Sequence, residues 1–177
     1  MTFMQLINNL ITTPHFLVSV LPPFLIASAL LFSRVVRSEL QQHWHLFFAC
    51  LAANFLVVMV QVFVINSRFD YLALHTSSFV SILIFYWCYT KVRVPTAGSI
   101  YLASWITIVI PDVFGAVSHY VYTLNPVSPG EWVRWPGGAG WFDYLVIGPV
   151  ATAILALIAR KLQLLNSESK IYKITRG

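Results

Sequence analysis

Asp112 has the side chain best placed for chemistry, because it lies near the middle of a long apolar run. An ionised carboxylate in hydrocarbon costs several kcal/mol unless it is paired or hydrated. Pro111 precedes it and has no N–H, so the carbonyl of Thr107 loses its helical partner. A carboxylate beside an interrupted helix is a common arrangement in transport sites. Alternatively, Asp112 is protonated or hydrogen-bonded and only ties helices together.

Helical spacing predicts that Asp112 shares one helix face with Gly115, Ala116 and His119. Small residues such as Gly115 and Ala116 allow a neighbouring helix to approach closely. We therefore expect Asp112 and His119 to point into a helix bundle rather than at lipid.

Three more titratable residues, His15, His75 and Asp143, are expected at a depth similar to that of His119. With Asp112 and His119 they could bind a ligand or relay protons. A divalent metal such as zinc is a minority alternative, with His75, His119 and Asp143 as ligands. In the other alternative, the residues at the helix ends are caps at the wet interface. We expect no other cofactor and assign no catalytic residue.

Asn54, Gln61 and Arg68 recur every seven residues and form one polar stripe. Amides in membrane spans usually hydrogen-bond between helices, for roughly 0.6–2 kcal/mol each, and we favour that interpretation. In the functional alternative, the stripe faces Asp112 and supports its site.

The elements that must position these residues are long apolar helices. The sequence is 58% hydrophobic and 10% charged, whereas soluble domains carry about 25% charged residues. About 20 apolar residues cross the roughly 30 Å of a bilayer's hydrocarbon. We predict an all-α polytopic membrane protein with about five transmembrane helices, over residues 14–32 (kinked at Pro22 and Pro23), 46–65, 71–89, 100–124 and 142–159, the last continuing towards 165.

The basic residues predict the orientation, since Lys and Arg are retained on the cytoplasmic side. Arg68 and Arg134 fall on one side of the threaded spans. The other nine fall on the opposite side: Arg34, Arg37, Lys91, Arg93, Arg160, Lys161, Lys170, Lys173 and Arg176. We therefore expect the N-terminus outside and the C-terminus in the cytoplasm, in a bacterial inner membrane.

The segments around the spans complete the predicted organisation. Residues 1–13 are expected to form a short amphipathic helix in the outer interface, and 14–165 the membrane domain. Within it, 34–45 should form a polar helical turn and 125–141 an outer flap rich in Trp, Pro and Gly. Residues 166–177 form a basic cytoplasmic tail that contacts anionic headgroups.

The function expected from these features is that of a small integral membrane protein. Its outward-facing buried polar pocket would bind or transport a proton, an ion or a small ligand. A non-catalytic subunit, such as an immunity, exclusion or accessory protein, is the first alternative. An exposed small-residue face at Ala151, Ala156 and Ala159 would support it. A membrane-embedded metal-dependent hydrolase or transferase is the second.

Partner classes follow from the same reasoning. The net charge of +5 is explained by topology, so we expect no nucleic acid. We expect the lipid bilayer as the surroundings. Because five spans rarely enclose a transport path alone, a homo-oligomer or a larger membrane complex is expected.

Overall fold

The computed structural model describes residues 17–18, 20–60, 72–123 and 144–175. Within its helices, the side chains of residues 58, 72–78, 112, 115–123, 144 and 168–175 lie outside the described part. All regular secondary structure in these ranges is helical, which confirms the all-α prediction for them. The helices are α3 (Leu21–Leu31), α4 (Arg34–Gln42), α5 (Trp44–Val60), α6 (Leu72–Thr90), α7 (Ala97–Thr123) and α8 (Tyr144–Thr175).

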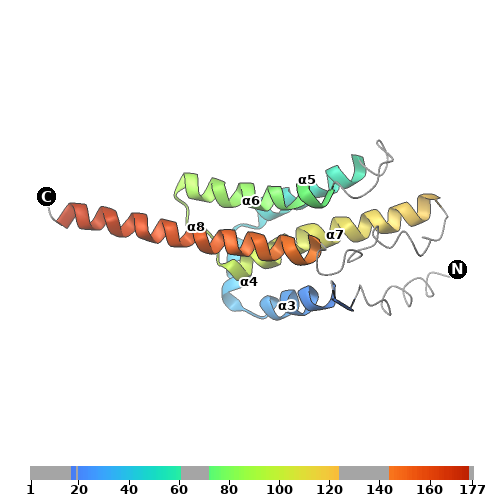
Figure 1. Cartoon of the computed structure of the whole chain (residues 1–177), viewed down its shortest axis with the longest axis horizontal. Coiled ribbons are helices and arrows are strands. Elements are labelled where there is room, and N and C mark those ends of the chain that lie inside the picture. The colour runs from blue at the N-terminus through green and yellow to red at the C-terminus, as the bar shows by residue number, and fades with distance from the viewer. Residues whose placement is uncertain (1–16, 19, 61–71, 124–143, 176–177) are drawn as a thin grey trace.

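Helix α7 is the centre of the bundle and contacts α3, α4, α5, α6 and α8. In Figure 1, α5 and α6 lie on one side of α7 and α8, and α3 lies on the other. Ala103 on α7 and Ala156 and Ala159 on α8 are buried in the main core cluster, together with Ile84 and Trp87 on α6. Small side chains allow helices to pack closely, and α7 and α8 form the most extensive contact of the fold.

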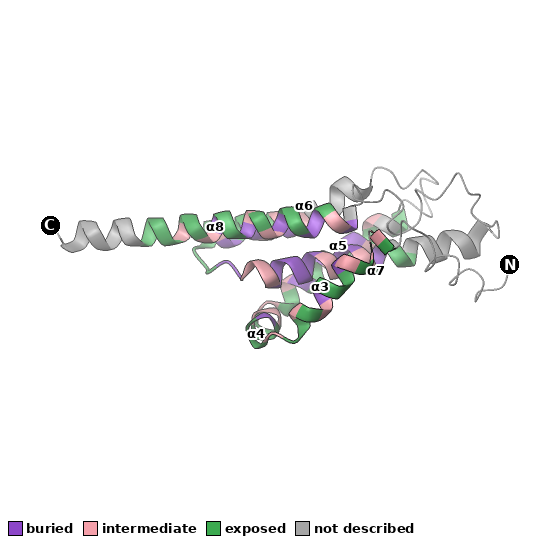
Figure 2. Cartoon of the chain, turned by 60° about the horizontal axis from the view of Figure 1, so that its bottom comes forward, coloured by how far each residue is buried: buried purple, intermediate pink, exposed green. Residues whose placement is uncertain are grey.

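The outer surface of the described bundle is largely apolar. Phe85, Leu56 and Leu157 are 63%, 66% and 57% exposed, and apolar side chains cover the exposed faces of α3, α5, α6 and α8. Figure 2 shows buried residues confined to the inner faces of these helices. A helix that is apolar all round is typical of a protein core or a membrane span.

By length and composition, one described segment could cross a membrane alone: Leu145–Ser167 in α8. Helices α3 and α4 are bent by 87° at their junction, and they form a second segment of sufficient length only if the pair is a single broken span. Shorter apolar segments cover Trp44–Val57, Phe79–Thr90 and Ala97–Pro111. Five spans therefore remain a prediction from the sequence.

Helix α4 turns sharply away from α3 and lies across one end of the bundle (Figure 2). The hydroxyl of Ser33 caps its N-terminus, accepting from Val36 N at 3.5 Å. Val36 is buried against α7, where a Cβ on Gly98 would lie 3.4 Å from Val36 Cγ2 and 3.0 Å from Leu30 Cδ2. The corner between α3 and α4 therefore packs closely against α7 at Gly98, whose side chain is a single hydrogen atom.

The start of α7 and the end of α8 lie outside the predicted spans. Helix α7 begins three residues earlier than residue 100, at Ala97, because Thr96 caps it. Helix α8 continues to Thr175, ten residues beyond the predicted end near 165.

Pro22 and Pro23 lie in the first turn of α3, after a turn at Val20. In a first turn the missing proline N–H costs little, since those donors have no helical partner.

Candidate functional site

A buried polar junction joins α5 to α7 beside Pro111. Asn54 on α5 is fully buried, and its Nδ2 donates to the backbone carbonyl of Thr107 at 2.7 Å. That carbonyl is the one that would accept from residue 111 in a regular helix, and proline has no N–H to give. The amide of Asn54 therefore replaces the missing backbone donor. We call Asn54, Ser104, Thr107 and Pro111 the polar junction.

The polar junction has more hydrogen-bonding capacity than its own contacts use. The hydroxyl of Thr107 donates to the carbonyl of Ser104 at 3.0 Å. Asn54 Oδ1 and Ser104 Oγ are buried, and neither has a hydrogen-bond partner among the described residues; nor has Nε1 of the adjacent Trp105. Since buried polar atoms are normally paired, hydrogen-bonding capacity is left unused in this part of the α5–α7 interface.

Two of the predicted site residues lie on α7 after this junction. Asp112 follows Pro111 in α7, and His119 lies two turns further along the same helix, while His75 lies on α6. The side chains of these three residues are outside the described part, so their contacts remain predictions. The same holds for the positions that lie outside the described residues altogether: His15, Gln61, Arg68 and Asp143.

The sequence indicates both the unpaired carbonyl of Thr107 and the polar side chain of Asn54, but it does not show that the two form a hydrogen bond. The two residues are 53 positions apart, and hydrophobic periodicity gives a helix its face but not its partner. The unpartnered hydroxyl of Ser104 was also missed, because a serine in an apolar run usually bonds back to its own helix.

The described side chains do not bring together three His, Cys, Asp or Glu residues that could hold a metal ion. The minority metal ligands, His75, His119 and Asp143, are not among those side chains. Cys50 and Cys88 are both free thiols.

A second polar cluster anchors α4 to the start of α7. Glu39 Oε2 accepts hydrogen bonds from Thr96 N at 2.7 Å, Thr96 Oγ1 at 2.7 Å and Ser99 Oγ at 2.6 Å. Burial raises the pKa of Glu39, but these hydrogen bonds and the charge of Arg160 outweigh it and hold the pKa below its ordinary value. The positive end of α7 also favours a carboxylate at this place.

The described basic residues gather at this same end of the bundle. Gln163 on α8 holds the loop after α6: its Nε2 donates to Val92 O at 3.0 Å, and its Oε1 accepts from Val94 N at 3.2 Å. Together with the Glu39 contacts, this brings α4, the 91–96 loop and the middle of α8 together. We call this region the basic end, because it carries Arg34, Arg37, Lys91, Arg93, Arg160 and Lys161.

Comparisons with known proteins give no relative for this chain: no family model, no curated protein and no solved structure matches it.

Proposed function

We propose that the chain is a small polytopic membrane protein of about five spans. Its basic end would lie at the cytoplasmic face and its polar junction inside the membrane. Support comes from the apolar side chains exposed around the bundle, since large exposed apolar surfaces mark membrane or protein contacts. The six basic residues at one end add to this, because such an excess is typical of the cytoplasmic side.

Within this protein, we propose that the region around Pro111 binds or transports a proton, an ion or a small ligand. The observation that carries the proposal is the pair of unpartnered buried oxygens, Asn54 Oδ1 and Ser104 Oγ, near the proline inside α7. A scaffold held together by apolar packing has no need of them, because each unpaired buried polar group costs about 1–3 kcal/mol.

Asp112 would supply the charge of this region, since it follows Pro111 directly on α7. His119, two turns along the same helix, would exchange protons with the outer side, because an ordinary histidine titrates near pH 6.5. His15, His75 and Asp143 would complete the outward-facing part of the pocket.

The accessory-subunit alternative has less support. Its expected docking face required Ala151, Ala156 and Ala159 to be open to a partner helix. Ala156 and Ala159 are buried in this chain's own core, and only Ala151 is exposed. Any partner of α8 would therefore dock on larger side chains such as Ile154 and Leu157.

The test compares wild type with Asp112→Asn in detergent from pH 5 to 8, with thermal unfolding followed by Trp fluorescence. We expect a pH-dependent melting temperature in wild type and a weaker pH dependence in Asp112→Asn, which should be at least as stable. Asp70→Asn, the same chemical change between two predicted spans, is the control and should keep the wild-type profile. A loss of several degrees at every pH in Asp112→Asn would make Asp112 a structural hydrogen-bond partner instead.

A further inference from the structure

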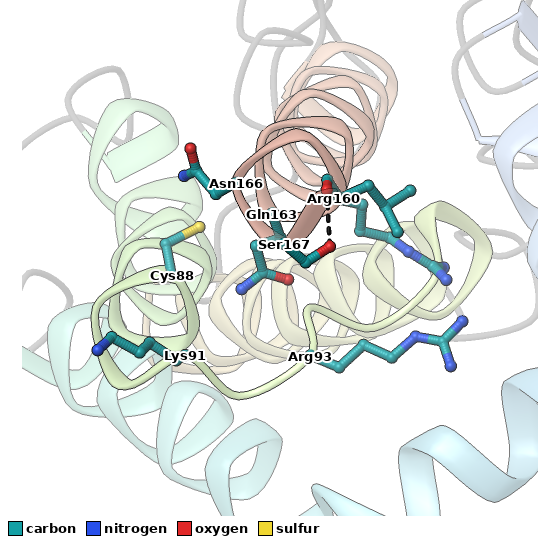
Figure 3. A pocket seen from close by; sticks show the side chains of 8 residues that line it. Cys88, Lys91, Arg93, Arg160, Gln163, Asn166 and Ser167 are labelled. Atoms are coloured by element: carbon teal, nitrogen blue, oxygen red, sulfur yellow. Dashed lines mark hydrogen bonds between the residues drawn. The ribbon is translucent and has the colours of Figure 1, made fainter. Parts of the chain in front are cut away.

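A basic cavity of about 570 Å³ opens at the basic end, between the end of α6, the following loop and α8. Figure 3 shows its lining seen along α8. Three of the lining residues are cationic, Lys91, Arg93 and Arg160, and none is acidic. The others are Cys88, Gln163, Leu164, Asn166 and Ser167. A cavity with such a lining favours an anionic ligand.

The two arginines of this cavity come from different elements but extend the same way. In Figure 3 the guanidinium groups of Arg93 and Arg160 both point to one side of α8, whereas Cys88 and Lys91 lie on the other. Guanidinium groups bind phosphate oxygens through paired hydrogen bonds, and they are better suited to this than lysine. The arginine side of the cavity is therefore the place where a phosphate group fits best.

Gln163 gives this side a defined geometry. Its two hydrogen bonds fix the backbone of Val92 and Val94, on both sides of Arg93, to α8. Lys91 has a φ of 60°, so the chain reverses sharply out of α6 just before this loop. Arg93 is thus held on a loop that is tied to the helix bearing Arg160, which lowers the entropic cost of binding a ligand between them.

Among the described side chains, the cavity keeps a positive charge. Glu39 is close enough to feel the charge of Arg160, but its single negative charge is outnumbered by Lys91, Arg93 and Arg160. Lys161 and Arg37 add positive charge at the same end of the bundle. The phosphate of a ligand would therefore meet a net positive field.

Apolar side chains flank the cavity and indicate which kind of phosphate it binds. Leu164, in the lining, is 63% exposed, and Leu165 and Tyr89, each next to a lining residue in the sequence, are 52% and 88% exposed. A free phosphate ion gains nothing from such neighbours, whereas the acyl chains of a phospholipid would cover them. At the cytoplasmic interface, anionic headgroups are also abundant.

We propose that this cavity is a binding site for the headgroup of an anionic phospholipid, with Arg93 and Arg160 contacting the phosphate and Gln163 positioning the loop. The inference rests on the membrane placement in the proposed function but not on the polar junction. Arg93, Arg160 and Gln163 all precede the basic C-terminal segment that begins at residue 166, of which only Asn166 and Ser167 reach the cavity lining.

The experiment measures the rise in melting temperature of the detergent-solubilised full chain on adding phosphatidylglycerol, phosphatidylcholine or inorganic phosphate. We expect phosphatidylglycerol to raise the melting temperature of wild type by several degrees, and the other two to have little effect. The double variant Arg93→Gln/Arg160→Gln should lose most of this rise, with apparent affinity at least about tenfold weaker. The control Arg34→Gln/Arg37→Gln removes the same charge from α4 at the same end and should keep it.

Three results would overturn the proposal: equal rises with both lipids, equal loss in both double variants, or a full rise with inorganic phosphate alone. If the Arg93/Arg160 double variant does not fold, native mass spectrometry of wild type decides: a retained phosphatidylglycerol supports the site, and none refutes it. Alkaline carbonate extraction of wild-type membranes separates the two proposals. Release of the chain would refute membrane placement itself, whereas integration without lipid selectivity would refute this site alone.

Discussion

Asn54 illustrates how one side chain can repair a defect made by another. Pro111 removes a backbone donor from α7, and the amide of Asn54 supplies a replacement from α5. The hydrogen bond both satisfies the carbonyl of Thr107 and ties two helices at the same point. A polar residue in an apolar helix can therefore have a purely structural role, without a ligand. For this reason the proposed binding site rests on the unpartnered oxygens and not on the amide nitrogen of Asn54.

This pairing predicts a specific non-additivity. Asn54→Leu should lower the free energy of unfolding by about 1–3 kcal/mol, because it leaves a buried carbonyl without a donor. In a Pro111→Ala background the residue at 111 again has an N–H, so the cost of Asn54→Leu should fall by at least about 1 kcal/mol. The measurement is unfolding of the four proteins of this cycle in detergent. Strictly additive costs would show that Asn54 does not act through the gap left by Pro111.

At the scale of elements, the docking of α4 on α7 depends on an ionised carboxylate. The pKa of Glu39 in the folded protein lies below its ordinary value of 4.5. Its ionised form therefore stabilises the fold above that value, and the contribution disappears as the pH falls through the lowered pKa. Glu39→Gln should melt below wild type at pH 7, and the difference should shrink below pH 4.5.

The measurement is the difference in melting temperature between wild type and Glu39→Gln across pH 3–7. Glu131→Gln, the same charge change in the predicted outer flap, should show no comparable trend. A difference that stays constant over this range would mean that the charge of Glu39 does not hold α4 in place.

The helices themselves were largely predictable, and their ends were not. Apolar runs of the right length gave the positions of α5, α6 and α7 because hydropathy and helical spacing agree there. Hydropathy could not find the start of α7, since the cap at Thr96 lies in a polar stretch. It also failed at the end of α8, where helix-forming residues such as Leu, Gln, Glu and Lys continue after the apolar run stops.

Contacts between distant segments were the part that could not be predicted. The sequence predicts only a polar turn around Glu39, although its carboxylate accepts hydrogen bonds from Thr96 and Ser99, 57 and 60 positions away. Gln163 was assigned no role, and its two bonds to Val92 and Val94 reach back about 70 positions along the chain. Such pairs depend on how helices pack, and a single sequence contains no direct signal for that.

At the scale of the whole molecule, the proposed orientation can be tested by chemical labelling of cysteines. In intact cells, a membrane-impermeant maleimide should not reach Cys88, which is partly exposed next to the basic end. After the membrane is opened, it should label Cys88, and a Cys88→Ser variant provides the blank. A cysteine placed in the predicted outer flap by Glu131→Cys, in a background without Cys50 and Cys88, should label in intact cells. The reverse pattern would invert the topology.

Helix α8 has one further consequence because of its length. It has 32 residues, which at 1.5 Å per residue is about 48 Å, and about 30 Å of this suffices to cross hydrocarbon. Figure 1 shows its C-terminal part continuing past every other helix. The remaining 18 Å or so would extend past the hydrocarbon, and a tilt of α8 by about 10° would move the tip of this part by about 3 Å. If α8 crosses the membrane as proposed, a force applied to that tip would be transmitted to Ala156 and Ala159, which are buried in the main core cluster with Ala103 of the central helix.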